Sequence, residues 1–482
     1  MLRDIPFFPC WSRWLQHLPR AQAKVDAYTL SELERRFGAC VPTTLFPKAT
    51  QKENSRDRIY TRWRTFWCVI WQALHPHSSG REVVRQLQAL FLLVGAPPIS
   101  EDDGAYFRAR GRLPEDQFAA ALAATAHAVQ PRRPTVSTLQ GRPIKLVDGS
   151  TVVLPDTPQN RAAYPAVSSP PPNFPLLRLV VLFAWASGAV LAVASGNLHQ
   201  SEFALFASLL GQLAEGDIVV GDRLFGSYVM VALLRARQVD FVGRTTRKVD
   251  GRRRTRRLGK NDWLLTWAKP AVASPWLAGA DWASVPPQLT VRVVRGRIRC
   301  RGYRVRELTV VTTLLDPKAY PAEQILRAYL QRWRLEMGLD DLKTTLGMEA
   351  LRGHSPNAVR QELYARLIAH NLVRWTMACA TQEHSVDLER LSFKGTLDAL
   401  RHFTAALARA RSKAKRHALW CELLRTLTAD LVPQRPGRRE PRAVKRKKNK
   451  YRRLNRPRHL FRDYPKRHQR RTRTRLRRLG LM

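Results

Sequence analysis

The sequence predicts an α/β protein with helical regions before and after its central sheet, and three observations indicate this fold class. Between about residues 12 and 127, apolar residues recur three and four positions apart, as they do on one face of a helix. Between residues 144 and 243 the pattern changes to β-branched runs that alternate with helical segments. From Pro321 onward the helical spacing returns.

The composition indicates a polyanionic partner. The chain has 482 residues, of which 44% are hydrophobic, so it is long enough for two or three domains. Lys and Arg number 83 against 38 acidic residues, which gives a formal net charge of +45. Such a chain repels itself unless a polyanion such as nucleic acid neutralises it. Ribosomal, histone-like and membrane-surface proteins are basic too, so the charge indicates a partner class and not a reaction.

Basic residues are concentrated at the end of the chain. Residues 431–482 contain 22 Lys and Arg and two acidic residues, Glu440 and Asp463. A low-complexity segment of one charge repels itself and does not bury a core. We therefore expect a disordered basic tail that binds phosphates without reading sequence, and a folded body with its own positive surface.

The sequence gives no sign of export or of a membrane span. Six cysteines are scattered without a Cys-x-x-Cys pair, which fits a reducing cytoplasm better than a disulfide framework or a zinc knuckle. The apolar run Leu179–Ala194 is interrupted by Ser187 and Gly188, and it predicts two strands around a turn. The first residues, MLRDIPFFPCW, lack the apolar segment of a signal peptide. We expect a cytoplasmic protein with no membrane partner.

The order of the central elements predicts a ribonuclease-H-like core. Three antiparallel strands, a helix, and then alternating strands and helices make up that order. Several other α/β folds begin with a hairpin as well, so the order alone leaves them open. We expect strands at 144–154, 176–185, 190–195, 218–221 and 240–243, and helices at 202–214 and 228–236.

These elements divide the chain into six parts. Pro131, Pro134 and Pro143 mark a boundary near residue 130, and an arginine run at 252–257 opens a region with strands predicted at 289–294 and 307–312. We expect a helical N-terminal DNA-binding domain (1–130), a first part of the ribonuclease-H-like core (131–243), a β-rich insertion (244–316), a second part of the core (317–380), C-terminal helices (381–430) and the disordered basic tail (431–482).

Two carboxylates lie on predicted strands of the core. Asp148 interrupts the apolar segment 144–153, and Asp222 ends the segment 217–222, where α/β sheets tend to place ligands. Each of them taken alone is an ordinary turn or helix-capping residue. Two carboxylates on one sheet repel each other unless a cation lies between them, and their oxygen atoms favour Mg²⁺ or Mn²⁺ over zinc.

A third acidic residue lies on a helix predicted over 322–345. Tyr329, Arg332, Glu336 and Lys343 are separated by two, three and six residues. At about 100° per residue they fall within a stripe about 60° wide on one helix face. On an isolated helix, Arg332 and Glu336 would be an ordinary surface ion pair.

Three other acidic residues nearby rank below these. Asp340 and Asp341 fall at the edge of the stripe or outside it, at about 20° and 120° on the same helical wheel. Asp156 follows Pro155 in a predicted turn.

The pattern Tyr-x2-Arg-x3-Glu-x6-Lys resembles the Tyr-Arg-Glu-Lys signature of DDE insertion-sequence transposases of family four, and its spacing is the same. The resemblance covers roughly residues 50 to 380. Further segments that resemble the family are SRDRIY (55–60), TFW (65–67), GAYFRAR (104–110), DGS (148–150), PDTPQN (155–160), VGD (220–222) and LRGHSP (351–356), followed by Glu362 and Asn371.

This resemblance implies an enzyme that cuts DNA at mobile-element ends and transfers the strands into target DNA. Asp148, Asp222 and Glu336 would be the catalytic carboxylates and would bind Mg²⁺ or Mn²⁺, two ions in all. The DNA phosphates at the element end would contact Tyr329, Arg332 and Lys343. The implied partners are double-stranded DNA, as terminal inverted repeats and target, and a second copy of the chain on that DNA. A bacterial protein of this kind would associate with the nucleoid.

Relatives in this family use a tryptophan of the insertion to hold a base flipped out of the duplex, and stacking on an indole ring favours such a base. The sequence does not choose among the four candidates, Trp263, Trp267, Trp276 and Trp282.

Two other functions remain open. A ribonuclease-H-like nuclease or junction resolvase would use the same acids without strand transfer, and the Tyr-Arg-Glu-Lys pattern argues against it. A catalytically silent DNA-binding protein derived from a transposase would keep only the fold, and the three intact acids argue against that.

Overall fold

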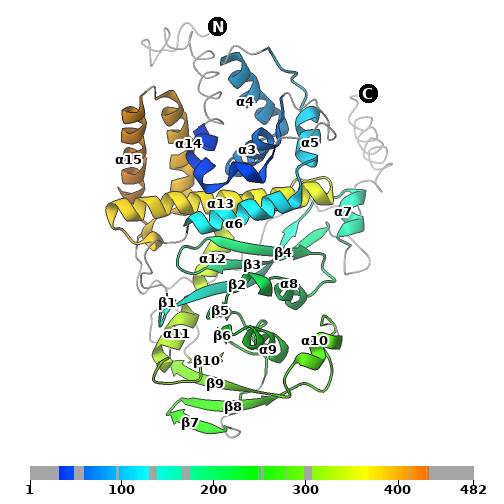
Figure 1. The fold of residues 1–482 in the computed structure, drawn as a ribbon, viewed down its shortest axis with the longest axis vertical. Helices are drawn as coiled ribbons and strands as arrows, with labels where there is room; N and C mark the ends of the chain where they lie inside the picture. The colour runs from blue at the N-terminus through cyan, green and yellow to red at the C-terminus, as the bar shows by residue number, and fades with distance from the viewer. Residues whose placement is uncertain are drawn as a thin grey trace, which may run out of the picture.

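The chain is an elongated molecule in which a long helix separates a helical part from a sheet, as Figure 1 shows. The structure is a computed structural model that describes residues 32–47, 59–93, 97–129, 138–165, 174–247, 249–250, 254–277, 279–297, 307–410, 412–429 and 431–433. The tail expected over 431–482 therefore lies outside the described residues apart from 431–433, as do residues 55–58 of the SRDRIY segment and 252–253 of the arginine run.

Within the described residues, the α-helices are α3 (Arg62–Leu74), α4 (Gly80–Leu93), α5 (Gly104–Gly111), α6 (Glu115–Val129), α7 (Pro158–Ala163), α8 (Glu202–Ser208), α9 (Tyr228–Ala236), α10 (Gly279–Ser284), α11 (Ala322–Leu330), α12 (Trp333–Asp340), α13 (Pro356–His384), α14 (Phe393–Arg409) and α15 (Lys413–Ala429). The strands are β1 (Thr138–Leu139), β2 (Arg142–Val153), β3 (Leu176–Ala184), β4 (Val190–Gly196), β5 (Ile218–Gly221), β6 (Asp240–Gly243), β7 (Arg256–Gly259), β8 (Asp262–Ala268), β9 (Gln288–Arg297) and β10 (Glu307–Thr312).

The strands form one mixed sheet in the order β4-β3-β2-β5-β6-β10-β9-β8-β7, with β1 beside β2. Antiparallel pairing joins β2 to β3 and β3 to β4, whereas β2, β5 and β6 are parallel neighbours. The α/β fold class is confirmed, and the strands and helices expected between residues 144 and 243 are present with ends shifted by a few residues. The helix expected over 202–214 ends earlier, at Ser208, and is followed by a 3₁₀ turn at Leu210–Gln212.

The residues expected to form a β-rich insertion extend the same sheet. Strand β10 pairs antiparallel with β6 and with β9, and β9 pairs with β8. On β9, the fully buried Arg292 donates hydrogen bonds to Asp262 of β8 and, at 2.7 Å, to the carbonyl oxygen of Tyr320. This buried guanidinium therefore fixes the sheet to the chain segment that leads into α11.

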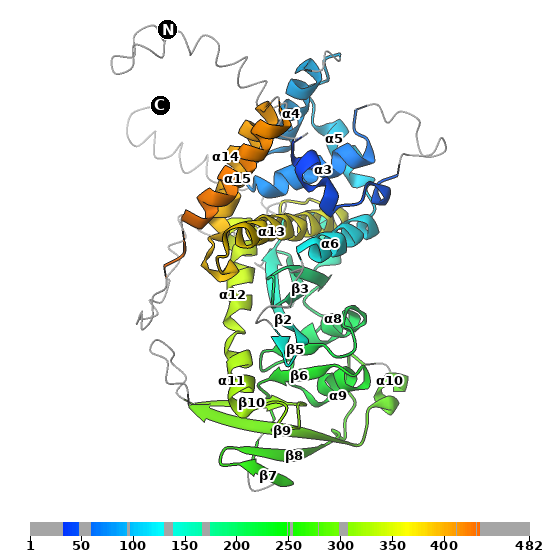
Figure 2. The same cartoon turned by 60° about the vertical axis from the view of Figure 1, so that its left-hand side comes forward.

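The two faces of the sheet are covered by different helices, which Figure 2 shows on opposite sides of the strands. Successive side chains of a strand point to opposite faces. Leu146 and Val220 pack in the cluster that includes residues of α12 and α13, whereas Val147 and Val219 pack with α8 and α9. Helix α12 therefore lies on one face of the central strands, and α8 on the other.

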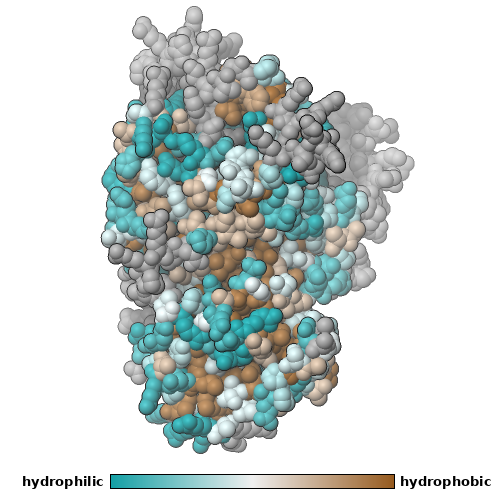
Figure 3. Space-filling view, viewed as in Figure 1, coloured by the Kyte–Doolittle hydropathy of each residue, from teal (hydrophilic) through white to brown (hydrophobic). Residues whose placement is uncertain are grey.

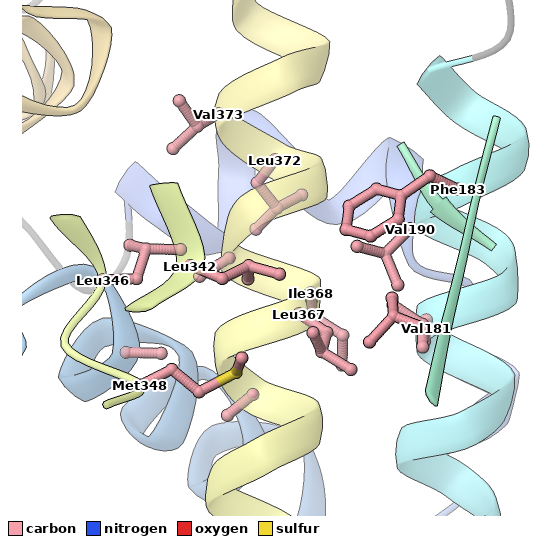
Figure 4. Packing of buried hydrophobic residues seen from close by; sticks show 14 of the residues in the cluster. Val181, Phe183, Val190, Leu342, Leu346, Met348, Leu367, Ile368, Leu372 and Val373 are labelled. Carbon is pink, nitrogen blue, oxygen red and sulfur yellow. The ribbon is translucent and has the colours of Figure 1, made fainter. Parts of the chain in front are cut away.

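Helix α13 is the centre of the larger core. Its 29 residues begin at a cap in which the Ser355 hydroxyl accepts a hydrogen bond from the backbone of Ala358. Figure 4 shows Leu367, Ile368 and Leu372 of this helix among Val181, Phe183 and Val190 of the sheet, and Leu342 and Leu346. The same cluster contains Phe66 and Phe118 of the N-terminal helices, so one continuous core joins the helical part to the sheet.

The uninterrupted helix predicted over 322–345 is wrong. Helix α11 ends at Leu330, a turn at Gln331 and Arg332 follows, α12 covers Trp333–Asp340, and a π-helix, η7, covers Asp341–Thr345. At the turn, the backbone of Arg332, Arg334 and Leu335 bonds three residues back instead of four. Packing explains the change: Leu335 and Leu339 are buried, and Gly338 lies against the Phe183 ring. π-Helical segments are rare and are frequent at functional sites.

The outer surface of the sheet region is mixed in polarity. On the face shown in Figure 3, brown apolar residues gather near the middle, over β3, β4 and α8, between teal hydrophilic areas. Leu191 of β4 and Phe203 of α8 are partly buried and pack against the core that contains α8 and α9. Within the described chain, no helix combines the length and the apolar character needed to cross a membrane.

Edge strand β4 is held to α13 by a buried amide. The side-chain oxygen of Asn371 accepts a hydrogen bond from the backbone N–H of Val190 at 2.8 Å, and its nitrogen donates to the carbonyl oxygen of Val190 at 2.9 Å. Asn371 is fully buried. Its amide therefore satisfies the backbone groups that an edge strand leaves unpaired.

We predict that Asn371→Leu lowers the free energy of unfolding by roughly 2–4 kcal/mol, because two buried backbone groups lose their partners. Equilibrium chemical denaturation measures this change. Gln382→Leu, at an exposed position of the same helix, is the control and should change stability by less than about 0.5 kcal/mol. Equal stability of the two variants would contradict the role given to Asn371.

Candidate active site

The parallel pairing of β2 with β5 brings two predicted site residues together. Val147 pairs with Gly221 in the register of these strands, so Asp148 and Asp222 are the next residues along each chain. Neighbouring strands lie about 4.8 Å apart. Asp148 alternates with Val147 and shares the face of Leu146, which is the face of α12. The structure therefore places the first two predicted acids side by side.

Both carboxylates also act as local turn acceptors. One oxygen of Asp148 accepts a hydrogen bond from the backbone N–H of Gly149 at 2.9 Å. One oxygen of Asp222 accepts from the backbone of Leu224 at 2.7 Å and of Phe225 at 3.4 Å. These bonds fix the orientation of each side chain, so the ordinary turn role of these residues and a role in a site are compatible.

The groups around Asp148 shift the pKa of its carboxyl in opposite directions. Burial raises the pKa of Asp148 to about 6, and the nearby carboxylates of Asp222 and Glu202 add to this, whereas the N–H of Gly149 and the guanidinium of Arg332 oppose it. Three carboxylates and one guanidinium thus share a partly buried space. Such a group of acids favours a bound cation.

Glu336 lies on α12 and is turned toward Arg332. Its oxygen Oε1 accepts from Nη2 of Arg332 at 2.7 Å, and its side chain is 61% exposed. Burial by itself lowers the pKa of Arg332, but the bond to Glu336 and the charges of Tyr329, Glu336 and Asp148 outweigh it, so that this pKa is raised. Arg332 therefore lies between Glu336 and Asp148.

Tyr329 is buried at the same place. Burial raises the pKa of its phenol, Arg332 and Arg244 oppose the rise, and Asp222 contributes to it. Arg244 follows β6, one residue beyond the paired glycines Gly221 and Gly243 of β5 and β6. Asp148 within β2, Asp222 directly after β5 and Arg244 directly after β6 thus occupy neighbouring positions across three parallel strands.

The expected stripe of four residues on one helix face is corrected by the broken helix. Tyr329 and Arg332 lie on either side of the end of α11, Glu336 is on α12, and Lys343 is in the π-helix. Among the described residues, no hydrogen bond or ion pair joins the Lys343 side chain to Tyr329, Arg332 or Glu336. The break at Gln331 and the wider π turn remove the constant 100° step on which the stripe was calculated.

Two charged residues of this region were not predicted from the sequence. Arg244 had a signal, because its position after β6 matches that of Asp222 after β5. No sequence signal indicated Glu202, the first residue of α8, because its approach to Asp148 depends on how the helix folds back over β2.

The three lower-ranked acids have structural partners. Asp156 forms an ion pair with Arg161, Asp340 accepts from the hydroxyl of Thr344 at 2.8 Å, and Asp341 lies 3.4 Å from Arg374. They stabilise local structure and are not part of the group around Asp148.

The four candidate tryptophans differ in their surroundings. Trp263 and Trp267 are 7% and 4% exposed and pack in the core on β8. The Trp282 ring lies under the ammonium of Lys269, 4.5 Å from the ring centre. Trp276 is partly buried and stacks on Phe203, with ring centres 5.8 Å apart and planes at 11°. Phe203 follows Glu202 in α8, so Trp276 packs against the first turn of the helix that carries Glu202.

The donor set suits a hard divalent cation. Asp148 and Asp222 supply carboxylate oxygens from neighbouring strands, and such oxygens are the usual ligands of Mg²⁺. Within the described residues, no three His, Cys, Asp or Glu side chains are already gathered closely enough to hold a metal ion. In the DNA-free chain the third acid, Glu336, is paired with Arg332.

The match to known families covers this site. Residues 139–372 match the family model described as "Transposase DDE domain", a span that includes Asp148, Asp222 and Glu336. A protein with this domain is an enzyme of DNA transposition.

Two relatives carry the same kind of name. The transposase InsG of insertion sequence element IS4 from Escherichia coli (strain K12) is 27% identical over 319 residues, which are 64% of this chain and 68% of the relative. A probable transposase of insertion sequence element IS5377 from Geobacillus stearothermophilus is 35% identical over 88 residues, 18% of this chain and 22% of the relative. Residues 139–372 thus match a transposase DDE domain, and the chain is similar to insertion-sequence transposases, among them that of IS4.

Among solved structures, a piggyBac transposase synaptic complex with hairpin DNA covers 79% of this chain and 78% of its own at 11% identity. The TM-score of this match is 0.38.

We predict that Asp148→Asn raises the melting temperature of the DNA-free protein at about pH 8 in the absence of divalent ions. The pKa of Asp148 is raised from 3.8 to about 6 in the folded state, so the folded protein binds this proton more tightly than the unfolded chain. The free energy of unfolding therefore falls as the pH rises from about 3.8 to about 6, where Asp148 loses its proton. Above about pH 6 the ionised carboxylate destabilises the folded protein.

At about pH 5, where the carboxyl of the folded protein is largely protonated, the gain should be smaller. Thermal unfolding at the two pH values tests this, with Glu215→Gln at an exposed position as the control. A melting temperature of Asp148→Asn equal to or below that of the wild type at pH 8 would refute the prediction.

Proposed function

We propose that this transposase cuts DNA at the ends of its mobile element and joins the cut ends to target DNA, with Asp148, Asp222 and Glu336 as its catalytic carboxylates. The observation that carries this proposal is the register of β2 and β5. It makes Asp148 and Asp222 neighbours within the matched DDE domain, on the side of the sheet where α12 carries Glu336.

The central strands support a ribonuclease-H-like core for this chain. Strands β4, β3 and β2 are antiparallel, α8 follows, and β5 and β6 then continue parallel to β2 with α9 between them. This is the order that the sequence predicted for such a core, and in it Asp148 of β2 lies beside Asp222, which follows β5.

Bound Mg²⁺ or Mn²⁺, two ions in this proposal, would supply the Lewis acidity that activates water and then a 3′-hydroxyl for attack on phosphodiester bonds. The chain's own residues determine where this occurs. Asp148 and Asp222 would hold the ions, and Glu336 would join them once its pair with Arg332 is broken. One site therefore serves both hydrolysis and strand transfer.

Arg332 has two competing partners in this proposal. In the DNA-free chain its guanidinium binds Glu336, and a DNA phosphate offers it the same kind of charged, bidentate acceptor. Tyr329 and Lys343 are the other proposed phosphate contacts, and the position of Arg244 beside Tyr329 supports a basic surface at this point. Phosphate binding to Arg332 would thus free Glu336 for the metal site.

The proposed partners are double-stranded DNA, as terminal inverted repeats and as target, and a second copy of the chain that holds the other element end. A net charge of +45 supports DNA binding and an association with the nucleoid.

We predict that Asp148→Asn, Asp222→Asn and Glu336→Gln each lower Mg²⁺-dependent cleavage of element-end DNA by more than roughly 100-fold. Labelled element ends separated on a denaturing gel measure the rate. Asp340→Asn, also on α12 but bonded to Thr344, is the matched control and should cleave at the wild-type rate. Wild-type cleavage by any of the first three variants would refute the assignment of that residue.

The same assay distinguishes the proposal from its alternatives. Joined product supports a transposase, cleavage without joining supports a nuclease or resolvase, and DNA retention without cleavage supports a silent DNA-binding protein. The proposal requires joined product from the wild type.

We also predict that Trp276 is the tryptophan that holds a flipped base, since it stacks beside α8 whereas Trp263 and Trp267 are buried in the core. Loss of base stacking costs about 1–3 kcal/mol. Trp276→Ala should therefore reduce the fluorescence change of 2-aminopurine placed near the element end. A full fluorescence change in Trp276→Ala would contradict this choice.

A further inference from the structure

Glu202 lies within the acidic group but belongs to neither the predicted triad nor the phosphate contacts. It is the first residue of α8, and Ser201 caps this helix by accepting a hydrogen bond from the backbone of Ala204 at 3.1 Å. The cap fixes where α8 begins and therefore where the Glu202 side chain starts.

The Glu202 carboxylate lies directly against the backbone of Gly149, next to Asp148. A Cβ atom placed on residue 149 would lie 2.8 Å from Oε1 of Glu202 and closer still to Oε2 and Cδ. Since real Cβ atoms do not approach oxygen so closely, only glycine permits this position of the carboxylate. The glycine of the DGS segment thus makes room for an acid from another part of the chain.

Glu202 and Glu336 approach the two aspartates from opposite faces of the sheet. Gly149 shares the face of Val147, which α8 covers, whereas Asp148 shares the face of Leu146, which α12 covers. Strand β5 ends at Gly221, but β2 continues to Val153, so beyond Asp148 strand β2 has lost its parallel neighbour. At this edge the charges of Glu202 and of the two aspartates act on one another.

The carboxylate of Glu202 has no partner among the described residues. No hydrogen bond or ion pair to it is found there. The cation whose charge it feels most is Arg178 of β3, and Nη1 of Arg178 donates to the carbonyl oxygen of Gln200 at 2.6 Å. A half-buried carboxylate next to two others is unfavourable unless a cation joins them.

We propose that Glu202 is a fourth carboxylate of the metal site, which holds a divalent cation together with Asp148 and Asp222, directly or through a metal-bound water. This inference rests on the proposed function of Asp148 and Asp222 as metal ligands. Glu202 supplies an oxygen ligand from the α8 face, and Mg²⁺ commonly keeps several waters beside one or two carboxylates.

Binding of Mn²⁺ to the full-length, DNA-free protein tests the proposal, with free Mn²⁺ measured by electron paramagnetic resonance. Glu202→Gln should weaken Mn²⁺ binding by roughly tenfold or more. Glu215→Gln removes the same charge at an exposed position and should bind as the wild type does. Asp148→Asn shows how much Mn²⁺ binding is lost when an aspartate of the proposed metal site is removed.

Thermal unfolding separates a metal ligand from a residue needed for folding. Without divalent ions, Glu202→Gln should melt at a higher temperature than the wild type, because one of three repelling charges is gone. Added Mn²⁺ should then stabilise this variant less than the wild type. A residue with a purely structural role would lower the melting temperature when changed.

Gly149→Ala tests the geometry without any change in charge. The added methyl group must displace the Glu202 carboxylate, so Mn²⁺ binding should weaken as it does in Glu202→Gln. If Glu202→Gln binds Mn²⁺ as tightly as the wild type while Asp148→Asn loses binding, Glu202 is not a ligand and the proposed function stands. If Asp148→Asn binds Mn²⁺ as the wild type does, or if the wild type binds no Mn²⁺, both proposals fail.

Discussion

The parallel pairing of β2 with β5 is the constraint on which the rest of the site depends. Its register, with Val147 opposite Gly221, turns two acids that are distant in sequence into neighbours at the point where β5 ends beside β2. Backbone hydrogen bonds then fix each carboxylate, from Gly149 in one case and from Leu224 in the other. Every other charged group of the site is placed relative to this pair: Arg244 by the next parallel strand, Glu202 by α8 and Arg332 by the turn before α12.

Asp148 and Asp222 carry like charges, and this repulsion explains two features around them: the position of Arg332 and the turn before α12. Arg332 offsets part of the repulsion in the DNA-free chain by lying between Asp148 and Glu336. The turn at Gln331 and Arg332 makes that position possible, since it lets α11 bury Tyr329 while α12 buries Leu335 and Leu339 against the sheet and leaves Glu336 at the surface. A straight helix would have kept Tyr329, Arg332, Glu336 and Lys343 in one stripe. The guanidinium of Arg332 and the carboxylate of Glu336 could then not have been oriented independently.

Local sequence pattern predicted the central strands and the positions of Asp148 and Asp222 well, because β-branched runs and strand ends are short-range features. It failed where tertiary packing decides. The break before α12 follows from the contact of Gly338 with Phe183, and the approach of Glu202 follows from α8 folding over Gly149. Neither contact leaves a periodic signal in the sequence. The domain division and the catalytic roles of the triad remain predictions. The stacking of Trp276 on Phe203 distinguishes it from the other three candidate tryptophans, which the sequence does not.

The energetics of α12 favour a site that changes when DNA binds. The pair between Arg332 and Glu336 has one largely exposed partner and joins residues four apart, and such pairs contribute only about 0.2–1 kcal/mol. A phosphate therefore competes easily for the guanidinium, and a divalent cation competes for the carboxylate. Trp333 and Met337, which flank Glu336, are 36% and 41% exposed, so little buried apolar contact on this side of α12 opposes a rotation. Because the sheet fixes the two aspartates and Glu336 is held by this weak pair, the metal site that we propose would be completed on DNA binding by a movement of Glu336.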